Sequence, residues 1–383
     1  MHVVYASQDA PNTYSKSIFL AGPSPRVPGR ANWRTEALDT LALLGYDGVV
    51  FVPLPEHGDW SHGFDAQREW EIQALNMADQ IVFWVPRDLT VVEGILEAPA
   101  LTTNIEWGKY FRTGRAVLGF PKEAPNTRYL AGDAKDESVP VFHTLSETLA
   151  EAVKRVGQGA ERSEGERFVP LGIWKLPHFQ GWYKAQVAAG NQLNKAEVLW
   201  TFRVGPNKAF TFAFSMHVSV FIASEGRNKT NEFVFSRTDL STCVLYRGNK
   251  VVLVREFRSP VRNERGFMYD LAGGSSWKQD ENPLEVIAHE VGEEIGIEIE
   301  PGRFIQHETR QAASSLSTHV VHLFSAELTE EEVDHLISHA GEVHGVLEDT
   351  ERTYAEVWGI QDICNQQLVD WSTLGMILSV VRV

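Results

Sequence analysis

Short apolar runs alternate with longer amphipathic segments between residues 17 and 156, and this alternation constrains the fold more than any other feature of the chain. The apolar runs are hydrophobic almost throughout, as in strands that a parallel sheet buries on both faces. The expected strands are 17–22, 48–53, 80–86 and 116–121. The expected helices are 31–45, 66–79 and 104–114, before a last strand and helix. The alternation predicts a doubly wound α/β domain over residues 1–156.

The texture of the sequence changes after residue 156. Residues 157–167 (GQGAERSEGER) are polar and predict a linker. Beyond them, segments rich in β-branched and aromatic residues are broken by turn signals, which is typical of antiparallel strands. One strong helical pattern, residues 283–295, interrupts these strands. We therefore expect a second domain of mixed α+β type over residues 168–383, with a strand extension at its N-terminal end.

Composition limits the partners and the compartment. The chain has 383 residues and a formal net charge of −16, so it has room for two or three domains and would repel DNA and RNA polymers. Its two cysteines, Cys243 and Cys364, have no metal-ligand spacing and favour a reducing compartment. The N-terminus lacks a signal pattern, and no apolar run is long enough to span a membrane. We expect a cytoplasmic homo-oligomer that binds small molecules rather than nucleic acid or membrane.

The helix expected at 283–295 carries Glu290, Glu293 and Glu294 on one face. Pro283 suits its first position, and Gly296 suits the residue just past its end. Like charges four apart cost a few tenths of a kcal/mol, so the cluster is better explained if a cation lies among the carboxylates. Clustered oxygen ligands suit Mg²⁺ or Mn²⁺. The alternative is a solvated acidic face in an acidic protein.

This stretch resembles the Nudix box, G-x5-E-x7-R-E-U-x-E-E-x-G-U, where U is a bulky aliphatic residue. From Glu281 onward the spacing holds, but His289 stands where the family has Arg, and one extra residue lengthens the preceding loop. The resemblance implies an α+β Nudix fold and Mg²⁺-dependent hydrolysis of a nucleoside diphosphate derivative. A glutamate from a later loop often serves as base, and the sequence leaves Glu348 and Glu351 open. The implied metal ligands are Glu290, Glu293 and Glu294, with Glu293 and Glu294 also catalytic.

The sequence before this box, VVLVREFRSPVRNERGFMYDLAGG, looks like the ADP-ribose-pyrophosphatase branch of the family. That branch has an Arg-bearing strand and an LPAGG-like turn ahead of the box. The resemblance implies substrate contacts from Arg255, Arg258, Gly273 and Gly274. The alternative for the two arginines is an ordinary place on a surface strand.

A second group of candidate residues lies in the α/β domain. Gly22 and Pro23 follow the first expected strand, where a doubly wound sheet offers its ligand crevice. Glu71 and Asp79 lie eight residues apart and flank the helix before the third strand, and Glu106 begins the next helix. We expect the three carboxyl groups to converge at the carboxyl edge of the sheet. Such a group suits glycosidic-bond chemistry, in which one carboxylate attacks the anomeric carbon and another protonates the leaving base.

Residues 16–156 resemble the nucleoside 2-deoxyribosyltransferase-like family, whose G-T-x-x-E-x-G motif bears the nucleophile. Thr103, Glu106 and Gly108 match this motif, and Thr102 replaces its first glycine. The resemblance implies that Glu106 is the nucleophile and Thr103 a substrate-binding residue. The alternative for Thr103 and Glu106 is a capping box that merely starts a helix.

The same resemblance places Glu71 and Asp79 at the family's acidic pair, with Glu71 where the transferases carry Asp. It leaves open whether the domain hydrolyses the N-glycosidic bond of a nucleoside monophosphate or transfers the sugar. Asp88 would contact the base or simply begin a turn. Lys16 and Arg26, near the first strand and turn, are candidates for phosphate binding.

The sequence as a whole predicts a bifunctional nucleotide-processing enzyme. Its Nudix half would split ADP-ribose or a modified nucleotide, and its first half would act on the resulting monophosphate. Two alternatives remain: a nucleotide-binding sensor with one or both domains catalytically silent, and an enzyme with Nudix activity alone.

Overall fold

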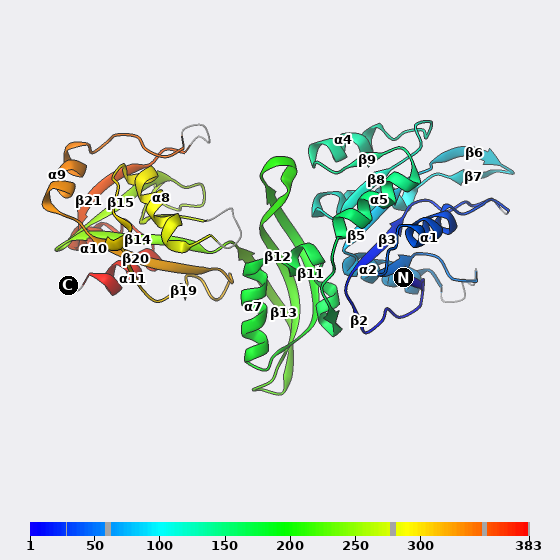
Figure 1. Cartoon of the computed structure of the whole chain (residues 1–383), viewed down its shortest axis with the longest axis horizontal. Coiled ribbons are helices and arrows are strands. Elements are labelled where there is room, and N and C mark those ends of the chain that lie inside the picture. Colours follow the sequence, from blue (N-terminus) through cyan, green and yellow to red (C-terminus); the bar gives the residue numbers. More distant parts are fainter. Residues whose placement is uncertain (28, 58–62, 276–280, 347–350, 382–383) are drawn as a thin grey trace. The chain divides into compact units, whose positions relative to one another are not determined.

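A computed structural model describes the chain except residues 28, 58–62, 276–280, 347–350 and 382–383. The chain forms two compact units, Met1–Phe235 and Ser236–Val383 (Figure 1). The boundary between these units therefore differs from the one expected at 157–167. Those residues belong to the first unit and contain β10 (Arg162–Ser163) and the start of a 3-10 helix, Glu164–Phe168.

The first unit is built on a parallel sheet, as the alternating pattern predicts. Six strands form it in the described part of the unit, in the order β1-β4-β3-β5-β8-β9. Every neighbouring pair is parallel. The strands are β1 (His2–Tyr5), β4 (Val49–Val52), β3 (Ser17–Ala21), β5 (Gln80–Trp84), β8 (Ala116–Gly119) and β9 (Val141–Phe142). After β3 the chain adds β4 on one side of that strand, and it then returns to add β5 on the other side. The strand order therefore reverses between β3 and β5.

Helices cover both faces of this sheet. One face packs on apolar residues of α1 (Trp33–Leu43) and α5 (Leu145–Val156). The other face packs on residues of α2 (Gly63–Met77), α3 (Leu101–Tyr110) and α4 (Arg128–Asp136). This confirms the α/β class of the N-terminal part. The edge strand β1, the helix α4 and a hairpin of β6 (Asp88–Val92) and β7 (Ile95–Ala98) were not expected.

The first unit also contains a short pairing of β10 with β2 (Thr13–Tyr14) and a separate small sheet that packs on α6 (Leu171–Trp174) and α7 (Pro177–Ala188). The strands of this small sheet are β11 (Gln192–Val204), β12 (Phe210–Ile222) and β13 (Arg227–Arg237), in that order. The core of this part contains Phe179, from α7, packed with Leu193, Phe214 and Met216 of β11 and β12.

The second unit is a mixed sheet between helices, which agrees with the α+β class expected here. Its main path is β16-β15-β14-β20-β18, in which β14 and β20 are parallel. The helix α8 (Pro283–Ile295) begins after Asn282 and ends at Gly296, as its sequence predicts. The core on one face of the sheet contains Ile287 and Val291 of α8, whereas the core on the other contains Ile363 and Ile377.

The remaining elements of this unit complete the two layers. Its strands are β14 (Leu240–Arg247), β15 (Lys250–Phe257), β16 (Phe267–Asp270), β17 (Ala272–Gly274), β18 (Ile305–Gln306), β19 (Arg310–Gln311), β20 (Val320–Glu327) and β21 (Tyr354–Gly359). Its other helices are α9 (Glu330–Ser338), α10 (Ile360–Gln366) and α11 (Trp371–Val380). In the described parts of both units, no helix is long and apolar enough to cross a membrane.

Candidate functional site

The turn after β3 lies where the strand order reverses. Gly22 has a φ of 158°, and a Cβ on it would lie 2.1 Å from the carbonyl oxygen of Trp84, at the end of β5. Only glycine fits this approach, because the obstructing atom belongs to the backbone. The indole Nε1 of Trp33 donates to the Pro23 carbonyl at 2.9 Å. The predicted residues Gly22 and Pro23 thus form a tightly held turn at the position where such sheets bind ligands.

Arg34, on the first turn of α1, forms hydrogen bonds with the end of β3 and the turn that follows it. Its guanidinium donates to the carbonyls of Leu20 (3.1 Å) and Gly22 (2.6 Å) and to Ser24 Oγ (3.0 Å). The residue is only 3% exposed, and burial lowers its pKa to about 10. We did not predict a role for Arg34 from sequence. The signal was its spacing with Ala37 and Leu41, which puts a charged residue on the buried stripe of the helix.

Glu106 and Glu71, on two helices of the opposite layer, carry charges that both favour the protonated form of Arg34. Burial raises the pKa of Glu106 to about 7, the charge of Glu71 raises it further, and Arg34 and Lys109 lower it. Burial also raises the pKa of Glu71, against the hydrogen bond from Gln67 Nε2 (2.9 Å) and the charge of Arg34. The structure therefore brings together two of the three carboxyl groups expected here, around one arginine.

Thr103 does not cap the helix that carries Glu106. The helix α3 begins at Leu101, after Ala100 with a φ of 59°, so Thr103 lies inside the first turn and is 3% exposed. The capping-box alternative is wrong for this pair. The helix is instead tied to the end of β5 by Arg87, which donates to Asn104 Oδ1 at 2.6 Å and to the Asn126 carbonyl at 2.6 Å. Arg87 is a further residue that the sequence did not single out.

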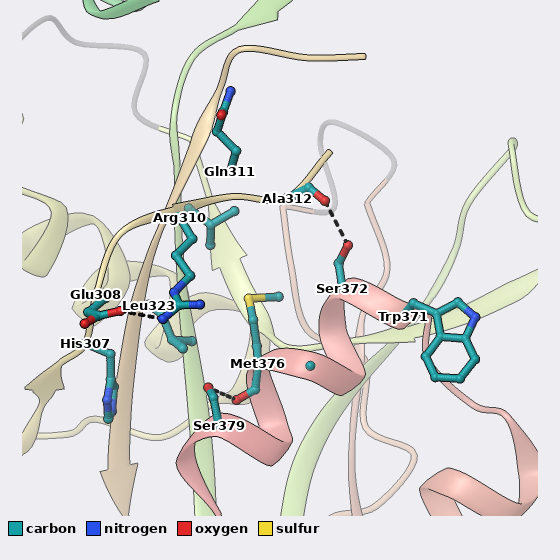
Figure 2. Close-up of a pocket in the computed structure, with 12 residues that line it drawn as sticks. His307, Glu308, Arg310, Gln311, Ala312, Leu323, Trp371, Ser372, Met376 and Ser379 are labelled. Carbon is teal, nitrogen blue, oxygen red and sulfur yellow. Dashed lines mark hydrogen bonds and ion pairs between the residues drawn. The ribbon is translucent and has the colours of Figure 1, made fainter. Parts of the chain in front are cut away.

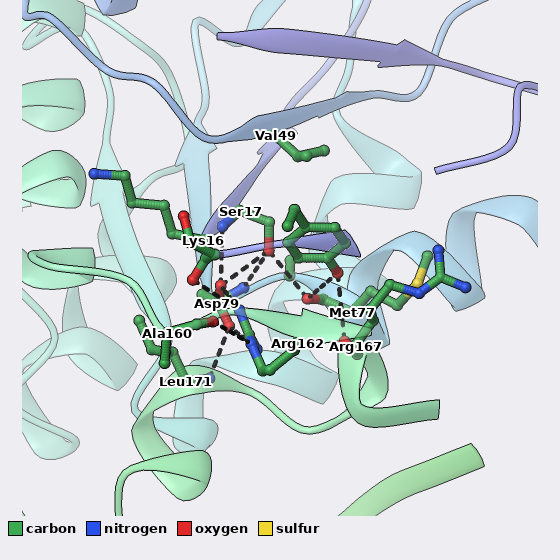
Figure 3. A network of polar contacts seen from close by, with 12 residues as sticks. Lys16, Ser17, Val49, Met77, Asp79, Ala160, Arg162, Arg167 and Leu171 are labelled. Atoms are coloured by element: carbon green, nitrogen blue, oxygen red, sulfur yellow. Dashed lines mark hydrogen bonds and ion pairs between the residues drawn. The ribbon is translucent and has the colours of Figure 1, made fainter. Parts of the chain in front are cut away.

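Asp79 is the exception among the predicted carboxylates, and Figure 3 shows why. It immediately precedes β5, so it lies at the amino edge of the sheet, opposite the edge that carries Gly22. It forms a buried ion pair with Arg162 (2.6 Å) and accepts from the backbone N–H groups of Ser17 (2.9 Å) and Leu171 (2.7 Å). The expected convergence is wrong for Asp79, because a residue before a parallel strand and one after it lie at opposite ends. Asp79 instead fastens the segment 162–171 to the sheet.

Three other candidates in this unit have local roles. The carboxylate of Asp88 accepts from the Thr90 N–H at 2.8 Å, which is the turn alternative considered from sequence. Lys16 precedes β3 at the amino edge and pairs with Asp47 at 2.6 Å, away from the turn after that strand. Arg26 lies on that turn, where its backbone N–H donates to the Glu97 carbonyl at 3.0 Å.

In the second unit, the two glycines expected in a turn lie in the strand β17 and meet the acidic helix α8. The Gly273 N–H donates to Glu294 Oε2 at 2.9 Å, and a Cβ on Gly274 would lie 2.1 Å from Glu290 Oε1. Glu294 is 5% exposed. Burial raises its pKa to about 8, and burial together with Glu293 raises that of Glu290 to about 7. The solvated-face alternative is therefore wrong for Glu294, which is buried beside β17.

Two more carboxylates affect the pKa values of Glu290 and Glu294. Glu351, from the loop before β21, raises the pKa of both Glu290 and Glu294. Glu256 of β15 raises that of Glu294, and burial raises its own pKa. Glu351 is thus the late-loop glutamate that the structure brings to the cluster, whereas Glu348 lies outside the described residues. Glu293 is partly exposed, and His289 Nδ1 lies 3.4 Å from its Oε2.

Arg255 on β15 and Arg258, one residue past the end of that strand, pair with different carboxylates, and successive residues of a strand point to opposite faces. Arg255 pairs with Glu356 (2.7 Å) and lies over the Tyr354 ring (4.2 Å). Arg258 pairs with Glu256 at 2.7 Å and therefore lies beside the carboxylate cluster. Since Arg255 precedes Glu256, it faces away from that cluster. The structure brings only Arg258 of the two to the predicted site.

Carboxylate oxygens suit a hard divalent cation in their chemistry. Among the residues that the structure describes, however, no group of three or more carboxylate, imidazole or thiol side chains is arranged to hold a metal ion. A pocket of about 490 Å³ in this unit lies elsewhere, on the opposite face of the sheet from α8. Figure 2 shows Arg310 and Gln311 of β19 across from Trp371 and Met376 of α11 there, and none of the predicted site residues lines it.

A comparison with protein families concerns the segment that contains the first of these sites. Residues 15–124 match a family model described as nucleoside 2-deoxyribosyltransferase like. No curated protein matches the chain. The matched segment runs from the start of β3 past β8 and includes Gly22, Arg34, Glu71 and Glu106. The chain therefore contains an N-terminal nucleoside 2-deoxyribosyltransferase-like domain.

Proposed function

We propose that the first unit cleaves the N-glycosidic bond of a nucleoside or nucleoside monophosphate, or transfers its (deoxy)ribosyl group, with Glu106 as nucleophile. The observation that carries the proposal is the meeting of Glu106 and Glu71 around one buried cation, Arg34, beside the Gly22 turn. The family match of residues 15–124 supports a nucleoside-processing role.

The charge balance of the site fits this chemistry. Burial raises the pKa of both carboxyl groups, whereas the charge of Arg34 lowers both, so one of the pair can hold a proton while the other is ionised. The ionised Glu106 attacks the anomeric carbon, and the bond from that carbon to the base breaks. The protonated Glu71 gives its proton to the departing base nitrogen. Water then attacks the glycosyl ester in hydrolysis, or a second base attacks it in transfer, and Glu71 takes up the proton.

The test is chromatography of products from ribo- and deoxyribonucleosides and their monophosphates. We expect free base from wild-type protein and none from Glu106→Gln or Glu71→Gln. Glu69→Gln is the matched control, because Glu69 lies exposed on the same helix as Glu71. Exchange of base without net hydrolysis, seen when a second base is added, would identify a transferase. Tight nucleotide binding without any product would instead favour the sensor.

For the second unit we propose Nudix hydrolysis of a nucleoside diphosphate derivative such as ADP-ribose. The specific support is the placement of Glu290 and Glu294 against Gly273 and Gly274 of β17, with the charge of Glu351 acting on both carboxyl groups. Glu290, Glu293 and Glu294 would hold Mg²⁺ or Mn²⁺, with the carboxylates drawing closer around the ion. A bound cation of this kind polarises a diphosphate and activates water.

In this second activity, Glu294 and Glu293 keep their predicted catalytic roles. Arg258 would contact the diphosphate, since it pairs with Glu256 and so lies on the same face of the sheet as the glutamate cluster. Monophosphate production from ADP-ribose with Mg²⁺, lost in Glu294→Gln and kept in Glu285→Gln, would support this function. Glu285 is an exposed residue of the same helix. The monophosphates released would be suitable substrates for the first unit, so the two reactions could run in series.

A further inference from the structure

The guanidinium of the buried Arg34 donates hydrogen bonds from all three of its nitrogens. Both ends of its guanidinium fork are used, with Nη1 on Ser24 Oγ and Nη2 on the Gly22 carbonyl, while Nε donates to the Leu20 carbonyl. Its guanidinium also lies 4.6 Å from the centre of the Trp33 ring. These contacts fix the cation to the turn after β3, and a side chain that is 3% exposed has almost no water to replace them.

Burying a charge is costly unless it is paired. Arg34 donates to neutral oxygens, so its charge is balanced by Glu106 and Glu71, which both favour its protonated form. The charged and titratable groups that act on Glu106 or respond to it are Glu71 on α2, Arg34 on α1, and Lys109 and Tyr110 on α3. Of these, only Arg34 is also hydrogen-bonded to the Gly22 turn.

We propose that Arg34 is the positioning residue of this site, linking the shape of the Gly22 turn to the charge of the Glu106–Glu71 pair. The inference rests on the proposed N-glycosidic function and adds a residue to it. Arg34 does not reach the reacting atoms in this account. It holds the turn on which the substrate lies and keeps one negative charge on the pair that acts on the substrate.

Arg115 provides a matched control within the same domain. It is likewise buried, at 8% exposed, and donates to the carbonyls of Leu75 (2.9 Å) and Ala78 (2.6 Å). Burial lowers its pKa to about 10, as for Arg34, but the charges that act on it belong to Tyr110 and Asp79. If activity falls only because a buried arginine is removed, substitution of Arg34 and substitution of Arg115 should therefore lower it alike.

The experiment measures kcat/KM for base release between pH 5 and 9 in wild type, Arg34→Met, Arg34→Lys and Arg115→Met. Loss of the Arg34 charge should move the acid limb of the profile to higher pH by about one pH unit. Arg34→Lys retains the positive charge but lacks the guanidinium group that bonds the turn. The acid limb of its pH profile should therefore coincide with that of wild type, while kcat falls about tenfold. Arg115→Met should lower the melting temperature and leave the limb where it is in wild type.

A folded Arg34→Met protein whose acid limb coincides with that of wild type would overturn the inference. If Arg34→Met shows no cooperative melt, Arg34→Lys decides alone: an unchanged kcat, or a limb displaced by a full pH unit, would overturn it. Base release that depends on Glu106 but ignores Arg34 would defeat this inference only. Absence of base release from wild type and Glu106→Gln alike would defeat the proposed function itself.

Discussion

The two carboxylate clusters of this protein are built on different principles of charge balance. In the first unit, Glu106 and Glu71 face a buried arginine that belongs to the fold. In the second, Glu290 and Glu294 have mainly other glutamates around them, and burial raises both pKa values well above their usual range. A pair balanced by the protein itself is suited to moving protons and attacking carbon. A cluster with surplus negative charge is suited to gathering a cation.

The largest effect should come from separating the two clusters by mutation. Glu106→Gln should reduce base release on the order of 10³-fold or more, because it removes the nucleophile, and should leave monophosphate production from ADP-ribose unchanged. Glu294→Gln should do the reverse. Both activities are measured on the same full-length preparations. A single substitution that abolishes both activities in a folded protein would break the comparison.

The next effect concerns Asp79, which the structure separates from the other carboxylates. Asp79→Asn leaves Arg162 without its charged partner, and breaking a buried pair of this kind costs about 3–5 kcal/mol. Denaturant unfolding should therefore show a large loss of stability in Asp79→Asn and a small change in Glu71→Gln. Activity per folded molecule should fall in Glu71→Gln and remain in Asp79→Asn. The opposite outcome would restore Asp79 to the catalytic group.

The surplus charge of the second cluster predicts a pH-dependent stability. Because the folded pKa of Glu294 lies above its unfolded value, its contribution is fully present below the unfolded pKa and is lost as pH rises toward about 8. Without divalent metal, the melting temperature of the second unit should fall as pH rises from about 5 to 8, and Mg²⁺ should restore it. Glu294→Gln should flatten both responses. Calorimetry that finds no response to Mg²⁺ at pH 8 would count against a cation site.

The smallest expected effect distinguishes Arg255 of β15 from Arg258, which follows that strand. Arg258→Gln should raise KM for ADP-ribose about tenfold, because Arg258 lies beside the cluster, paired with Glu256. Arg255→Gln should leave KM nearly unchanged and lower stability, because its ion pair with Glu356 lies on the other face. Steady-state kinetics and thermal melting of both variants measure the difference. A larger KM effect at Arg255 would mean that the substrate approaches from the opposite face.

Much of the fold was predictable because local patterns decide it. The apolar runs form the central strands, and the helix 283–295 begins at Pro283 and ends at Gly296 as expected, since both signals are local. The segment 157–167 was misjudged for a physical reason. It is polar in composition, yet Arg162 inside it is fully buried by a partner 83 residues earlier in the chain. Composition alone cannot show such a long-range ion pair.

In the candidate sites, too, local sequence patterns were predictable and contacts between distant parts of the chain were not. Gly22, Glu71 and Glu106 could be placed from their positions after a strand or on the helices of one layer. Asp79 could not, because its spacing from Glu71 suggested a pair while its position before β5 puts it at the far edge. Arg34 was missed because it acts through hydrogen bonds to backbone carbonyls, which no sequence motif records.

The most direct test of the account is to trap the sugar on the protein. Wild type would be incubated with a 2-fluoro-substituted nucleoside, whose glycosyl ester hydrolyses slowly, and then analysed by intact-mass and peptide mass spectrometry. We expect one added sugar on the peptide that contains Glu106, present in Glu69→Gln and absent in Glu106→Gln. An adduct on a different residue, or base release that continues undiminished in Glu106→Gln, would contradict it.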